Sequence, residues 1–153
     1  ESLRDIEMTP LVEDGVVFVG SFQGNLISVD ALNGSLIWSK PMSILSNIAI
    51  DEDNIYVADT KGYIFALDRF SGFTKWKLQL ENNLIGAQSF SYGKYIVNIS
   101  TTGHVMVIDK IQGKILSLVK IIGNIDHQVK GVLTNKILYI TSKNGRLNAI
   151  KID

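Results

Sequence analysis

The feature that most constrains this chain is a seven-residue frame that recurs four times and begins each time with glycine. Successive first glycines lie 38, 41 and 42 residues apart, and the frame ends in aspartate in three of its four copies. A second glycine follows each aspartate by four residues, and in two copies a tryptophan follows that glycine by four. Such regular spacing predicts a repeat protein. The repeat positions are Gly24, Asp30, Gly34 and Trp38; Gly62, Asp68, Gly72 and Trp76; Gly103, Asp109 and Gly113; and Gly145.

Each repeat contains short runs that are typical of β-strands. In the first repeat we expect strands at about 9–12, 16–21, 25–30 and 36–40. The runs are rich in β-branched and aromatic residues, are too short for helices, and are separated by glycine-containing turns. Units of about 40 residues with four strands each are typical of propeller blades, which must pack against neighbours on both faces.

We therefore expect an all-β fold, a β-propeller fragment of about four four-stranded antiparallel blades. The expected blades span about 9–40, 47–79, 87–120 and 130–153, and residues 1–8 form a segment between blades. The last blade is expected to be incomplete. Because the chain opens with Glu1 and has no charged-then-apolar leader, we expect it to begin inside a longer protein.

Composition narrows the range of functions. The net charge is zero and the pI is about 7.0, so no overall basic field attracts nucleic acid or an anionic membrane. The absence of cysteine excludes disulfides, thiolate zinc sites and a cysteine nucleophile. No apolar run approaches the roughly 20 residues of a membrane-spanning helix. Residues 1–80 carry six basic and eleven acidic side chains, and residues 81–153 carry nine and four. We interpret this asymmetry as an uneven solvated surface rather than a device that orients partners.

The repeated aromatic and acidic residues have two interpretations. Trp38 and Trp76 could stack on a quinone or a base, but their fixed place in the repeat favours wedges between blades. Asp30, Asp68 and Asp109 could suggest a carboxylate cluster, but they lie on different blades at one turn position, which favours bonds to turn amides.

No residue is expected to perform catalysis or to bind a cofactor or metal. The acidic run at 51–54 lacks the alternating ligands, glycine and distal glutamate of a calcium loop, so we expect a solvated hairpin turn. The two histidines, His104 and His127, lie a blade apart with no nucleophile in view. Gly20 and Gly24 do not precede a helix, as a phosphate-binding loop would require.

The frame from Gly62 to Trp76 resembles the repeat of the pyrroloquinoline-quinone (PQQ) propeller superfamily. Within it, the whole chain resembles the BamB family, the propeller lipoproteins of the outer-membrane β-barrel assembly machinery. The resemblance is carried by residues 3–10, 15–18, 23–26 and 34–38 and by the final strand from Gly145. It departs at Ser117, where the repeat has tryptophan, and at Lys151, where it has aspartate.

This resemblance implies the C-terminal half of an eight-bladed propeller whose last blade takes its outermost strand from the N-terminus. It implies a non-enzymatic adaptor that binds the periplasmic domains of the barrel-inserting subunit through Arg4, Asp5 and Glu7. It also implies a location on the periplasmic side of the outer membrane of a Gram-negative bacterium, with a lipid anchor on a part of the protein that precedes this chain. The other interpretation of the three charged residues is a frayed terminus.

Two alternatives stay open from the sequence. The chain could be part of a PQQ-dependent periplasmic dehydrogenase, although such enzymes typically carry adjacent cysteines that are absent here. It could also be part of a propeller sensor domain. A half ring leaves one blade face bare at each end, so we further expect two copies to pair as a homodimer. Residues 1–8 are one source of a strand for the open edge of the last blade.

Overall fold

The computed structural model describes residues 9–21, 24–44, 46–81, 84–121 and 131–153. Within these ranges the chain forms fifteen strands in four antiparallel sheets and no helix. Each sheet is built from strands that are consecutive in the sequence and pair with their neighbours, so every sheet is one repeat unit. The all-β propeller fold expected from the repeat is therefore confirmed, including a last sheet of three strands.

The strand bounds follow the repeat closely. The first sheet contains β1 (Leu11–Glu13), β2 (Val16–Gly20), β3 (Asn25–Asp30) and β4 (Leu36–Pro41). The second contains β5 (Ala49–Ile50), β6 (Asn54–Ala58), β7 (Tyr63–Asp68) and β8 (Thr74–Gln79). The third contains β9 (Gly86–Tyr92), β10 (Tyr95–Ser100), β11 (His104–Asp109) and β12 (Ile115–Lys120). The last contains β13 (Gly131–Thr134), β14 (Ile137–Thr141) and β15 (Leu147–Lys151).

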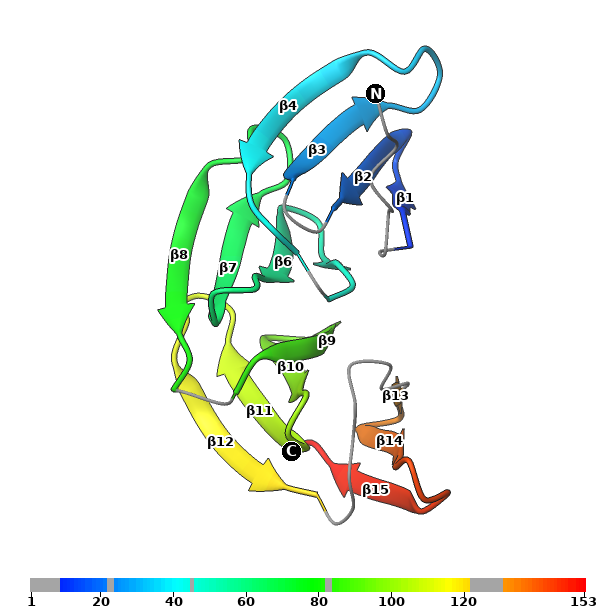
Figure 1. Ribbon diagram of the computed structural model, residues 1–153, viewed down its shortest axis with the longest axis vertical. Helices are drawn as coiled ribbons and strands as arrows, with labels where there is room; N and C mark the ends of the chain where they lie inside the picture. Colours follow the sequence, from blue (N-terminus) through cyan, green and yellow to red (C-terminus); the bar gives the residue numbers. More distant parts are fainter. Residues whose placement is uncertain (1–8, 22–23, 45, 82–83, 122–130) are drawn as a thin grey trace.

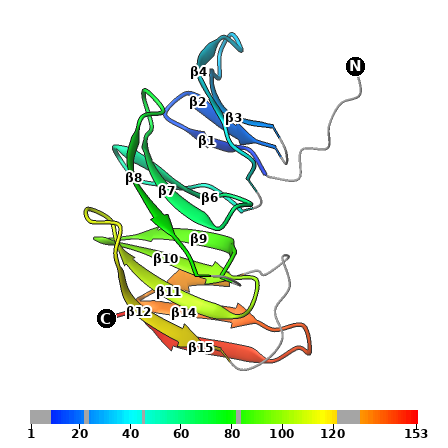
Figure 2. The same cartoon turned by 60° about the vertical axis from the view of Figure 1, so that its left-hand side comes forward.

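The four sheets follow one another along an arc (Figure 1). The fourth strands β4, β8 and β12 lie on the convex side, and the earlier strands of each sheet lie toward the concave side. A turned view shows the same sheets stacked face to face in chain order (Figure 2). The described residues thus form an open arc of blades, in which the first and last sheets each pack against one other described sheet.

One turn geometry connects the third and fourth strands of the first three sheets. The amide of the second repeat glycine donates to the carbonyl of the repeat aspartate, at 2.8 Å in the first sheet and 2.9 Å in the next two. A β-bulge then shifts the register by one residue in all three sheets. Bulges of this kind bend a strand and increase its local twist.

Three apolar cores lie between successive sheets. The first is centred on Phe18, Leu26 and Trp38 against the second sheet, and the second on Tyr56 and Ile64 against the third. The third core joins the third and last sheets. The core therefore consists of the interfaces between blades and not of the interior of any single sheet, as expected for thin sheets that bury both faces.

Candidate functional site

The two repeat tryptophans act as wedges between blades. The Trp38 Nε1–H donates to the carbonyl of Arg69 at 2.9 Å, and the Trp76 Nε1–H donates to the carbonyl of Lys110 at 2.7 Å. In each case the accepting residue lies in the turn of the following sheet. Gly72 lies in the turn that receives Trp38, and a Cβ added to Gly72 would lie 2.9 Å from the Trp38 ring.

Each wedge has an aromatic companion from its own sheet. The Phe18 and Trp38 ring centroids lie 6.0 Å apart, and those of Tyr56 and Trp76 lie 6.1 Å apart. Both pairs are tilted, an arrangement that adds stability beyond the area buried. Both indole N–H groups are therefore satisfied within the fold.

The repeat aspartates organise the turns that receive the wedges. The carboxylate of Asp30 accepts from the amides two and three residues later, at 2.8 and 3.1 Å. Asp68 does the same at 3.1 and 2.9 Å, and Asp109 at 2.9 and 2.7 Å. The carboxylates are thus bonded to local amides in three separate turns and form no joint cluster.

Cations in two of these turns reach back to the preceding sheet, a feature that the sequence analysis missed. Arg69, which is 6% exposed, pairs with Asp14, and Lys110 pairs with Asp51 at 3.0 Å. Both cations directly follow a repeat aspartate, and both carboxylates lie in the first hairpin of the preceding sheet. The same inter-blade ion pair therefore occurs at two successive interfaces.

Asp51 is the centre of a polar cluster at the second interface. Its carboxylate accepts from the Asn54 amide and the Tyr56 hydroxyl, each at 2.9 Å, in addition to the Lys110 ammonium. Burial alone would raise the pKa of Asp51, but the bonds from Lys110 and Tyr56 outweigh it and hold that pKa below its ordinary value. Burial, followed by the bond to Asp51, raises the pKa of the Tyr56 hydroxyl, which stays protonated and donates.

We expect Asp51→Asn to lower the free energy of unfolding by about 1–2 kcal/mol at pH 7, because a charge-assisted bond across the interface is lost. The folded-state pKa of Asp51 lies below its unfolded value, so this contribution is present above about pH 4. It disappears as the pH falls through the folded pKa. Urea unfolding at pH 7 and pH 3 measures both differences.

Asp53→Asn is the matched control, since Asp53 lies exposed in the same turn. Its effect should stay within about 0.5 kcal/mol at both values of pH. An Asp51→Asn deficit that persisted undiminished at pH 3 would show that the carboxylate charge is not what stabilises the interface.

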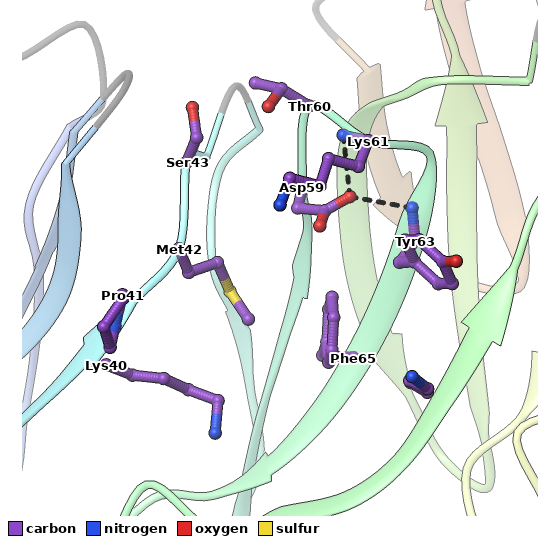
Figure 3. Close-up of a pocket in the computed structure, with 10 residues that line it drawn as sticks. Lys40, Pro41, Met42, Ser43, Asp59, Thr60, Lys61, Tyr63 and Phe65 are labelled. Atoms are coloured by element: carbon purple, nitrogen blue, oxygen red, sulfur yellow. Dashed lines mark hydrogen bonds between the residues drawn. The ribbon is translucent and has the colours of Figure 1, made fainter.

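A pocket of about 370 Å³ lies between the first and second sheets (Figure 3). Met42 and Phe65 form its apolar wall, and Tyr63 lies at its rim. The carboxylate of Asp59 accepts from the amides of Lys61 and Tyr63 at 2.9 and 2.8 Å, so it is engaged in shaping the β6–β7 turn. The pocket therefore has an apolar wall and a polar rim. An apolar centre within a polar rim is typical of surfaces that receive a side chain of a partner protein.

Lysine dominates the charge of this pocket. Lys40, Lys61 and Lys77 line it, against the single carboxylate of Asp59. The Lys77 ammonium lies 5.5 Å from the centroid of the Tyr63 ring. The pocket therefore has a positive rim, which favours a carboxylate from a partner.

The pocket marks one end of the blades, which we call the pocket end. It holds the β6–β7 turn and the end of β4 at Pro41. Antiparallel pairing of Leu11 with Phe18 and of Gly20 with Leu26 places the start of β1 at this same end. Arg4, Asp5 and Glu7, the partner-binding residues expected from the sequence, precede β1 but lie outside the described residues.

Within the described ranges the acidic and histidine side chains do not gather into a metal site. No group of three His, Cys, Asp or Glu side chains is arranged there to hold a metal ion. Asp51 binds turn amides and protein side chains, as a structural turn residue does. The His104 ring lies 2.9 Å from the Thr102 hydroxyl, and His127 falls outside the description. Over the same ranges there is also no helix that is long and apolar enough to cross a bilayer.

Comparison with known proteins places this architecture in a class. The chain shares its fold with a solved structure of BamB from Moraxella catarrhalis, with a TM-score of 0.84 and 23% identity over 97% of this chain and 44% of that one. A quinohemoprotein alcohol dehydrogenase from Comamonas testosteroni also shares the fold, with a TM-score of 0.64 and 20% identity over 78% of this chain. Four repeat sheets, the first three of them joined by two tryptophan wedges, together with the family match reported next, define a PQQ-like propeller.

Comparison of sequences identifies a single family within this class. Residues 1–78 match the family model described as outer membrane protein assembly factor BamB. The curated BamB of Legionella pneumophila is 26% identical over 99% of this chain, and that of Escherichia coli K12 is 26% identical over 98%. The chain belongs to the BamB family. It spans about two fifths of the length of these relatives, 39% and 38% respectively.

Proposed function

We propose that this chain works in outer-membrane protein assembly as a non-enzymatic adaptor, on the periplasmic side of the outer membrane of a Gram-negative bacterium. Family membership carries the proposal, since the matched relatives are named as assembly factors. The lysine-rimmed pocket between the first two sheets agrees with a binding role. A propeller offers rigid loops at each end of its blades, which suits the presentation of binding residues.

We further propose that its partner is the set of periplasmic domains of the barrel-inserting subunit, which meets the pocket end. Two features support this surface. Arg4, Asp5 and Glu7 directly precede the strand that begins there, and the lysine-rimmed pocket opens there. The surface would thus combine acidic groups, lysines and an apolar recess, a mixture that gives specificity through complementary charge. Membrane attachment would come from a lipid anchor on another part of the protein.

The experiment is a calorimetric titration of the chain with those periplasmic domains. The double variant Asp5→Lys and Glu7→Lys, and separately Lys61→Glu, should each weaken binding about tenfold at low salt, because each reverses charge at the contact. The loss should shrink as salt rises.

Lys114→Glu is the control for both variants. Lys114 is exposed in the β11–β12 turn at the opposite end of its blade, so its reversal should leave the affinity unchanged. Equal affinity for wild type and all three variants would reject the pocket end as the contact surface.

A further inference from the structure

A second recess lies between the second and third sheets, at the end of the blades opposite the pocket end. It has a volume of about 380 Å³ and is lined by Tyr56, Lys75 and Trp76 of the second sheet and by Lys94, Lys110 and Ile111 from turns of the third. We call it the turn-end recess. Both sheets have all four of their strands, so the recess belongs to an interface that is internal to the arc.

The turn-end recess has an aromatic floor. Trp76 is only partly buried there, whereas Trp38, at the same repeat position, is 8% exposed. Both indoles donate to a carbonyl of the following sheet, so both perform the same structural role. Ile111, which is 86% exposed, adds apolar surface to the lining. The Trp76 ring is therefore open to an apolar group that enters the recess.

Three lysines and one carboxylate line the turn-end recess. Lys110 pairs with Asp51 at 3.0 Å, so these two charges offset each other. Lys75 lies 3.7 Å from the Asp68 carboxylate, and 44% of its side chain is exposed. Lys94 is exposed, and no carboxylate of the described residues pairs with it. The lining therefore carries two lysines beyond the one that its own carboxylate neutralises.

The first interface shows which of these features the packing of blades requires. It shares with the second interface the tryptophan wedge, the bond from the indole to the next sheet and the inter-blade ion pair. It lacks the two additional lysines, because Ile37 stands at the position of Lys75 and Asp53 at the position of Lys94. The additional lysines are thus not needed to join two blades, which favours a role in binding.

We propose that the turn-end recess binds an acidic side chain and its apolar neighbour from an extended segment of a partner protein. Lys75 and Lys94 bind the carboxylate, and the apolar side chain packs on the Trp76 ring. A phosphate group lacks the apolar part that this floor accommodates. An anionic membrane surface is disfavoured, because Glu52 and Asp53 are exposed in the adjoining β5–β6 turn. The proposal concerns the opposite end of the blades and does not depend on the function proposed above.

The test is a nuclear magnetic resonance titration of the chain with the peptide acetyl-Leu-Glu-Leu-amide, in which the indole N–H signals of the two tryptophans are followed. We expect the Trp76 signal to shift saturably while the Trp38 signal stays in place. Acetyl-Leu-Gln-Leu-amide has the same shape without the charge and should bind at least about fivefold more weakly at low salt. No shift of Trp76, equal shifts of both indoles, or equal affinity for the two peptides would each overturn the proposal.

Two substitutions give the recess the residues of the first interface. Lys75→Ile and Lys94→Asp should each weaken binding of the glutamate peptide at least about fivefold, because each removes a cation that faces the carboxylate. Lys114→Gln is the matched control, since Lys114 is exposed in the neighbouring β11–β12 turn but does not line the recess. It should change the affinity less than about twofold. An equal loss in Lys114→Gln would show a response to overall charge and contradict the proposal.

Two further probes distinguish other occupants. Inorganic phosphate at the peptide concentration should leave the Trp76 signal in place, and an equal shift would show a general anion site and overturn the proposal. Vesicles that contain anionic lipid should not sediment the chain, and sedimentation that Lys75→Ile abolishes would reassign the recess to a membrane surface. All three substitutions are at exposed positions. An unchanged Trp38 indole signal checks that each variant is folded.

Discussion

Gly113→Ala is expected to lower the free energy of unfolding by about 2–4 kcal/mol. Gly113 adopts a φ of 64°, and a Cβ built there would lie 2.6 Å from the ring of Trp76. The substitution therefore combines backbone strain with a collision against a ring that is held in place by its bond to the Lys110 carbonyl. Urea unfolding followed by tryptophan fluorescence measures the change.

Gly34→Ala separates the two causes. Gly34 occupies the same turn position with a φ of 72°, but no atom lies within 4 Å of an added Cβ. Its cost should be about 1 kcal/mol, from backbone strain alone. In a double-mutant cycle, Trp76→Ala should remove most of the excess cost of Gly113→Ala. Equal costs at Gly34 and Gly113 would show that the indole does not press on the turn.

The strands and the wedge positions could be predicted because they repeat in the sequence. The spacing of Gly62, Asp68, Gly72 and Trp76 is local, and it fixes a turn, a bulge and the side chain that packs on the next blade. The observed strands differ mainly at their ends, where β1 begins at Leu11 and β4 extends to Pro41. Proline is tolerated there because β4 is an edge strand, whose last residue can do without a ladder bond.

The contacts between sheets could not be predicted in the same way. Arg69 and Asp14 are 55 residues apart, and neither belongs to the repeat frame by residue type. One pattern in the sequence could have indicated these ion pairs, since a cation directly follows the repeat aspartate in both the second and third units. The pocket is still harder to predict from the sequence, because its lining combines Lys40 at the end of one repeat with Lys61 and Lys77 of the next. Only the packing of blades brings these side chains together.

The replacement of the third tryptophan by Ser117 shows how the fold accommodates a weak repeat. The interface between the third and last sheets has no indole wedge within the described ranges. Ile121, 5% exposed, lies in its core at the position that Met42 and Leu80 hold at the other two interfaces. Ile152, 3% exposed, lies there too and stands where the second and third units have Arg69 and Lys110, so an aliphatic side chain supplies burial at a position that carries a cation in those units.

An adaptor and a cofactor enzyme differ in what this chain should bind. A quinohemoprotein alcohol dehydrogenase shares this fold, so architecture alone does not decide the function. The chain has no cysteine to lie against a quinone. We therefore expect no saturable binding of PQQ with calcium at micromolar concentrations, and binding of the periplasmic domains of the barrel-inserting subunit in the same range.

The most direct measurement is a pair of calorimetric titrations on one preparation of the chain, the first with those periplasmic domains and the second with PQQ and calcium. We expect a saturable heat with the domains, weakened by Asp5→Lys with Glu7→Lys, and no saturable heat with PQQ. Saturable binding of PQQ together with no binding of the domains would contradict this expectation.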